Sequence, residues 1–132
     1  MDKKFHMTAE IVIAEDDETT RDVVEYNLSD KGWDVLAFTD GDECWEHLES
    51  RANDPPDLVV LDVMMPELDG ISVLERIRDH DALVDLPVVM LTSRNREEDI
   101  VQALDAGADD FVAKPFSEVE LVSRVEKVLD EA

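Results

Sequence analysis

The sequence predicts an α/β protein in which helices cover both faces of a parallel, five-stranded sheet. Short apolar runs carry this prediction, because such runs suit strands that are buried on both faces. Each run stops at polar residues, and segments with apolar residues at helical spacing lie between the runs. A length of 132 residues is enough for one domain with a substantial core. The runs are Ile11–Ala14, Leu58–Leu61, Val88–Leu91 and Phe111–Ala113.

The first half of the chain is expected to contain three strands and two helices. Asp17 is expected to cap the first helix, because aspartate side chains accept from the free amides there. Val23, Val24 and Leu28 stand at helical spacing in that helix, and Gly32 ends it. In chain order the elements are Ile11–Ala14, Asp17–Lys31, Asp34–Phe38, Gly41–Ser50 and Leu58–Leu61.

The second half is expected to alternate helix and strand in the same way. Pro66 and Gly70 break the chain into a turn before the third helix, and Gly107 closes the fourth. Ser117 followed by Glu120 predicts a capping box at the start of the last helix. The pattern therefore predicts a (βα)5 three-layer sandwich with the flavodoxin-like strand order 2-1-3-4-5. The elements are Gly70–Asp79, Val88–Leu91, Arg96–Ala106, Phe111–Ala113 and Ser117–Leu129.

Polar residues that follow the apolar runs are expected to meet at one edge of this sheet. Parallel strands of a doubly wound sheet all deliver their carboxyl ends to the same side. Taken alone, Asp62 could simply terminate its strand. The set as a whole offers oxygen ligands for a divalent cation, and a lysine and a hydroxyl for phosphate oxygens. The residues are Glu15, Asp16, Asp62, Thr92 and Lys114.

The net charge of −23 separates this chain from ordinary globular domains. It comes from 35 acidic and 12 basic residues. Such a surface repels nucleic acid and anionic membranes, so we expect direct binding to neither. It also repels itself, which favours an environment where salt screens charge, such as that of a halophile. An acidic domain of a multidomain protein is the alternative.

The remaining composition predicts a cytoplasmic protein. Cys44 is the only cysteine, so no disulfide can form within the chain, which suits a reducing compartment. No apolar run reaches transmembrane length, and no signal peptide is visible. Residues 1–7 are expected to be a tag or a disordered start, with Met7 as the natural first residue, and residues 8–132 a single domain.

From Glu10 to Leu129 the chain resembles the receiver domain of two-component response regulators. The resemblance implies a signalling protein rather than an enzyme, one that catalyses only its own phosphorylation and slow dephosphorylation. Its partners would be a sensor histidine kinase or histidine phosphotransfer protein, and a downstream effector. The matching motifs are the pair Glu15-Asp16, LDVMMPELDG around Asp62, LTS at Thr92, and GADDFVAKPF ending at Phe116.

The resemblance implies that Asp62 attacks the phosphorus of a phosphohistidine and forms an acyl phosphate. Asp16 and Asp62 match the direct ligands of Mg²⁺, together with the backbone carbonyl of Met64. Glu15 matches the position that reaches the metal through water. A small number of protein ligands suits Mg²⁺, which keeps several waters.

Two further residues match contacts to the phosphoryl group. Thr92 corresponds to the hydroxyl that hydrogen-bonds it, and Lys114 to the ammonium that pairs with it. The Lys114-Pro115 bond is expected to be cis, as in relatives. Phe111 stands where many relatives have tyrosine, and its ring is expected to rotate inward when the Thr92 hydroxyl moves to the phosphate. Phe111 lacks the tyrosine hydroxyl that could bond a partner; a phenylalanine that stays in the core is the alternative.

Met64 and Arg94 occupy the positions that tune attack by water in this family. Neither side chain can orient a nucleophilic water, and both are bulky, so we expect a comparatively long-lived acyl phosphate.

Asp110, Glu120 and Arg124 resemble part of the charged set that dimerises the receivers of winged-helix transcription regulators. Gln102 stands where those proteins usually place a basic residue, so one pair between subunits is missing. Because exposed ion pairs contribute little singly, we expect a monomer, with at most weak, salt-promoted dimerisation after phosphorylation.

Other classes fit less well. A phosphatase of the haloacid-dehalogenase type needs a second aspartate two residues after the nucleophile, where this chain has Met64. A P-loop NTPase needs a GK[ST] loop, which is missing from the sequence. A flavodoxin would place the negatively charged phosphate of its flavin against these carboxylates, which repel it unless a metal ion is present. A degenerate receiver that signals without phosphorylation would lack some of the motif residues, all of which are present.

Overall fold

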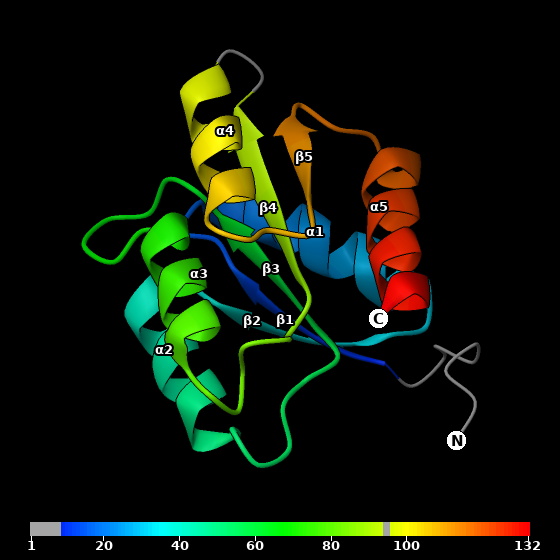
Figure 1. Cartoon of the computed structure of the whole chain (residues 1–132). Helices are drawn as coiled ribbons and strands as arrows, with labels where there is room; N and C mark the ends of the chain where they lie inside the picture. Colours follow the sequence, from blue (N-terminus) through cyan, green and yellow to red (C-terminus); the bar gives the residue numbers. More distant parts are fainter. Residues whose placement is uncertain (1–8, 94–95) are drawn as a thin grey trace.

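The computed structural model describes residues 9–93 and 96–132 and has the predicted α/β architecture (Figure 1). A five-stranded sheet has the order β2-β1-β3-β4-β5, and every neighbouring pair is parallel. The predicted (βα)5 fold and strand order are therefore confirmed. The strands are β1 Glu10–Ala14, β2 Asp34–Phe38, β3 Leu58–Asp62, β4 Val88–Ser93 and β5 Asp110–Lys114. The helices are α1 Glu18–Asp30, α2 Gly41–Ser50, α3 Gly70–Asp79, α4 Glu97–Asp105 and α5 Glu118–Glu131.

The sheet is the middle of three layers, with α1 and α5 on one face and α2, α3 and α4 on the other (Figure 1). Successive residues of a strand point to opposite faces, so β3 supplies both cores. Leu58 and Val60 pack with the α1 and α5 side, whereas Val59 and Leu61 pack with the α2 to α4 side. Because both faces are covered, the whole strand is apolar until it reaches Asp62.

The helix starts follow the predicted capping chemistry. The Asp17 side chain accepts from the Thr20 amide at 2.9 Å, and Ser117 accepts from the Glu120 amide at 3.1 Å. At the other ends, Gly32 and Gly107 have φ of 103° and 104°, a region that favours glycine. β2, α2 and α3 have the predicted bounds, and ends of the other elements shift by one or two residues; β3 and β4, for example, run on into the polar residues that follow them. None of the described helices has the length and apolar character needed to cross a membrane.

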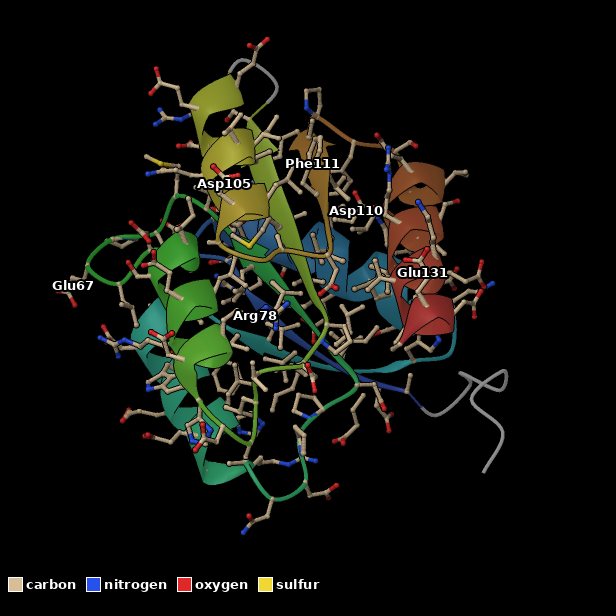
Figure 2. All side chains as sticks on the ribbon, in the orientation of Figure 1. Glu67, Arg78, Asp105, Asp110, Phe111 and Glu131 are labelled. Atoms are coloured by element: carbon tan, nitrogen blue, oxygen red, sulfur yellow. The ribbon has the colours of Figure 1, made fainter. Side chains whose placement is uncertain are left out.

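The β3–α3 loop is constrained where α3 begins and at its outer tip. A Cβ on Gly70 would collide with the Asp62 carbonyl oxygen, so only glycine lets the helix begin this close to the strand end. Glu67, at the outer tip of the loop, has φ of 64° (Figure 2). A left-handed conformation disfavours a residue with a Cβ, so Glu67 is held in this conformation by the residues around it.

We predict that Glu67→Gly raises the free energy of unfolding by about 0.5–1 kcal/mol, because glycine adopts φ near 64° without the Cβ penalty. Urea denaturation followed by circular dichroism measures it. Glu75→Gly is the control: this exposed residue lies inside α3, where the same change should lower stability by a similar amount. A loss of stability in both variants would contradict the prediction.

Candidate functional site

The candidate residues lie where four neighbouring strands end, at what we call the carboxyl edge of the sheet. Asp62 is the last residue of β3 and is paired with Leu91 of β4. Thr92 of β4 is paired with Ala113, next to Lys114 at the end of β5. Glu15 and Asp16 directly follow β1, which is the other neighbour of β3. The predicted convergence is therefore present, although 99 residues separate Glu15 from Lys114 in sequence.

Three carboxylates form a compact acidic cluster at this edge. Glu15, Asp16 and Asp62 each offer an oxygen, and these oxygens all lie within 4.8 Å of one another. Glu15 is fully buried and Asp62 is 4 % exposed, whereas Asp16 faces solvent. Oxygen-only donors, one of them open to water, suit a small hard cation that keeps part of its water shell. Met64, 53 % exposed, follows Asp62 by two residues.

Lys114 is the cation that balances this cluster. Its Nζ donates to Glu15 Oε1 at 2.9 Å and to Asp62 Oδ1 at 3.1 Å. Burial alone would lower the pKa of the Lys114 ammonium, but the two carboxylates outweigh burial and the pKa is raised. Lys114 is therefore held charged. The Lys114-Pro115 bond is cis, as predicted.

Glu15 has an unusual protonation equilibrium for a glutamate. Burial raises the pKa of its carboxyl to about 7, and the neighbouring Asp62 carboxylate adds to this, while Lys114 opposes it. Its second oxygen, Oε2, accepts from the Asp17 amide at 3.1 Å. Two buried carboxylates thus share one ammonium, so the cluster retains an excess of negative charge that favours a further cation.

Thr92 presents a buried hydroxyl to which no other described residue is hydrogen-bonded. The residue is 2 % exposed, and its Oγ1 has no hydrogen-bond partner among the described residues. Buried hydroxyls are normally bonded, because leaving one unpaired costs about 1–3 kcal/mol. An oxygen arriving at the carboxyl edge would give this hydroxyl an acceptor.

The predicted switch and interface residues lie on β5, α4 and α5, and Asp110 stands at the amino end of β5, opposite to the carboxyl edge. Phe111 and Asp110 are adjacent on β5 (Figure 2). Phe111 is partly buried against the core on the α2 to α4 side. Asp110 pairs within the chain with Arg124 of α5 at 3.3 Å, while Gln102 is exposed on α4. Arg94, predicted to tune attack by water, lies outside the described residues.

One contact to the acidic pair was missed by sequence reasoning. Arg21 of α1 donates from Nη1 to the carbonyl oxygens of Glu15 at 3.0 Å and Asp16 at 3.4 Å. A bond from a side chain to a carbonyl five or six residues earlier has no sequence signature, so only the structure could find it.

The chain is similar to known proteins. Residues 11–126 match the family model of the response regulator receiver domain. The chain is 40% identical over 123 residues to the alkaline phosphatase synthesis transcriptional regulatory protein PhoP of Bacillus subtilis, covering 93% of this chain and 49% of the relative. It is 40% identical over 126 residues to the phosphate regulon transcriptional regulatory protein PhoB of Rhizobium meliloti, covering 96% and 54%.

A solved structure agrees with these relatives. The signal receiver domain of a signal transduction histidine kinase from Syntrophus aciditrophicus superimposes with a TM-score of 0.85 at 33% identity, covering 95% of this chain and 92% of that one. The chain thus belongs to the response regulator receiver family, and it spans about half the length of the curated relatives it matches.

We predict that Thr92→Val raises the free energy of unfolding of the metal-free protein by about 1 kcal/mol, because it removes a buried, unpaired hydroxyl. Thr20→Val is the control, since the Thr20 hydroxyl donates to Asp17 Oδ2 at 2.7 Å and its loss should lower stability. Urea denaturation compares the two. Equal losses would show that the Thr92 hydroxyl already has a partner.

Proposed function

We propose that this receiver domain accepts a phosphoryl group on the Asp62 carboxylate, from the phosphohistidine of a sensor histidine kinase or histidine phosphotransfer protein. The observation that carries the proposal is the setting of Asp62. A buried carboxylate stands beside a charged lysine, at the same edge of the sheet as a hydroxyl with no partner in the described part of the chain. We further propose that the phosphorylated domain signals to a downstream effector.

In the proposed reaction, an Asp62 oxygen attacks phosphorus while the bond from phosphorus to the histidine nitrogen breaks. The products are an acyl phosphate on Asp62 and, once a ring nitrogen has taken up a proton from solvent, a free imidazole on the donor. The Lys114 ammonium, now 3.1 Å from Asp62 Oδ1, is close enough to pair with the transferred group. The Thr92 hydroxyl donates to one of the phosphoryl oxygens and so gains the acceptor that it lacks.

The acidic cluster fits Mg²⁺, and we propose this ion as the cofactor. Asp16 and Asp62 would hold it with the Met64 carbonyl, and Glu15 would reach it through water. Bound Mg²⁺ supplies positive charge that offsets repulsion between the carboxylates and the incoming phosphoryl group.

Two residues of the site would convert phosphorylation into a change of shape. Movement of the Thr92 hydroxyl toward the phosphoryl group opens space behind it, and the Phe111 ring rotates into that space. The partly buried position of Phe111 supports this role, since the ring already contacts the core on one side. Without a hydroxyl, Phe111 signals by occupying volume and forms no hydrogen bond with a partner.

The output of this switch is proposed from the relatives. The two regulators named above, PhoP and PhoB, are transcriptional regulatory proteins about twice as long as this chain. We propose that the domain acts through an effector and does not contact nucleic acid itself, because its net charge is −23. The buried single cysteine, Cys44, favours the reducing cytoplasm.

We propose that the unphosphorylated domain is a monomer. Arg124 is already paired with Asp110 inside the chain, so a dimer through this face must exchange that pair for one between subunits.

The rival function is an aspartyl-phosphate hydrolase, which would release its phosphoryl group many times. Met64 at the position of the general acid argues against it. Acetyl phosphate with Mg²⁺ and a phosphomonoester separates the two functions. A receiver gains one phosphoryl group per chain and leaves the phosphomonoester intact, whereas a hydrolase turns over many molecules of it.

We predict that Asp62→Asn abolishes phosphorylation by acetyl phosphate and Mg²⁺, since the amide keeps the shape of the carboxylate but is not a nucleophile. Intact-protein mass spectrometry detects the added group, and circular dichroism checks the fold. Asp81→Asn, the same change at an exposed residue of the α3–β4 loop, should be phosphorylated as the wild type is. Mass addition that persists in Asp62→Asn would assign the acceptor to another carboxylate.

We predict that Met64→Glu shortens the lifetime of the acyl phosphate about tenfold, because a carboxylate two residues from the acceptor can orient a water for attack. Met64 is half exposed, so the new side chain fits without entering the core. Met64→Leu, which adds no polar group, is the control. The decay of the phosphorylated form after removal of the donor measures the lifetime, and an unchanged or longer lifetime would count against a tuning role.

A further inference from the structure

The exposed member of the acidic cluster is held only through its backbone. Within the part of the chain that the structure describes, no hydrogen bond or ion pair reaches the Asp16 carboxylate. Glu15 and Asp62, by contrast, are fixed by Lys114. The position of the Asp16 carboxylate therefore depends on how firmly the loop between β1 and α1 is anchored.

Arg21 supplies a side-chain anchor for the backbone of the acidic pair, in addition to the Glu15 amide, which donates to the Phe38 carbonyl at 3.1 Å. From the first turn of α1 its half-buried side chain turns back, and Nη1 donates to the Glu15 carbonyl at 3.0 Å and to the Asp16 carbonyl at 3.4 Å. The cap formed by Asp17 on Thr20 holds the next residue of the loop. The helix dipole does not stabilise a positive charge at the start of a helix. The guanidinium is instead held here by its bonds to the two carbonyl oxygens.

We propose that Arg21 is a positioning residue for the cation site. By fixing the peptide groups of Glu15 and Asp16, it sets the direction in which the Asp16 side chain leaves the loop, and so keeps its oxygen within reach of Glu15 and Asp62. The inference rests on the proposed function, because it concerns the same cation site. Groups that orient metal ligands typically change metal affinity by 10- to 100-fold when they are removed.

Charge alone predicts the opposite change in Mg²⁺ affinity when Arg21 is removed. A guanidinium beside three carboxylates repels an incoming cation, so its removal would by charge alone strengthen Mg²⁺ binding. If Arg21 positions Asp16, its removal weakens Mg²⁺ binding even though the site becomes more negative. The direction of the change therefore separates the two roles.

Arg51 offers a matched control. It pairs with Glu10 at the opposite end of β1, where Nη1 and Nη2 each donate to one of the glutamate oxygens at 2.9 Å. Arg51→Gln removes the same charge as Arg21→Gln without touching the carboxyl edge. Arg21→Lys keeps the charge and loses the shape of the guanidinium.

The experiment is a titration of the metal-free proteins with Mg²⁺ and no phosphoryl donor, followed by backbone amide NMR shifts. We expect affinity to fall about tenfold in Arg21→Gln and by a smaller factor in Arg21→Lys, and to stay near the wild-type value in Arg51→Gln. Binding by Arg21→Gln that equals or exceeds that of Arg51→Gln would overturn the inference and leave the proposed function intact.

Two further outcomes are also decisive. If Arg21→Gln does not fold, Arg21→Lys takes its place: weaker binding than wild type supports positioning, and equal binding overturns it. A wild-type protein that does not bind Mg²⁺ at all would overturn the proposed cofactor and this inference together.

Discussion

The contact of Lys114 with Glu15 and Asp62 is the interaction on which the rest of the site depends. Two carboxylates buried side by side repel each other, and each loses several kcal/mol of hydration. The ammonium between them, at 2.9 and 3.1 Å, offsets much of this cost, and it can do so only if β1, β3 and β5 end at the same level. Apolar residues of the same volume would often be at least as stable, so such a cluster is a sign of function.

Strand order explains why this long side chain is needed. Because β4 lies between β3 and β5, Lys114 must span about two strand spacings, roughly 10 Å, to reach Asp62. The strand that it spans carries Thr92, whose hydroxyl has no partner among the described residues. The strand order 2-1-3-4-5 thus brings Asp62, Thr92 and Lys114, which are far apart in sequence, to the ends of three neighbouring strands.

The sheet and the carboxyl edge could be predicted because both depend on residue type along short segments. Apolar runs mark buried strands, and the polar residues after them must share an edge once the sheet is parallel. Contacts that depend on side-chain direction could not be predicted. Arg21 reaches back to Glu15, and Arg124 reaches Asp110 across fourteen positions, with nothing in the local sequence to indicate either. The positive φ of Glu67 could not be predicted either, because glycine is the residue type that indicates a positive φ in a sequence.

Charge acts on this domain at two scales. The net charge of −23 repels anionic donors and acidic partners at a distance, and salt weakens that repulsion beyond a Debye length of about 10 Å at 0.1 M. At the site the balance is local, because Lys114 lies in direct contact with Asp62 and is itself partly buried, where salt screens little. Ionic strength should therefore change the rate at which an anionic molecule reaches the carboxyl edge. It should change the contacts of Lys114 with the acidic cluster much less. A saline source would explain the surface but is not required by the chemistry of the site.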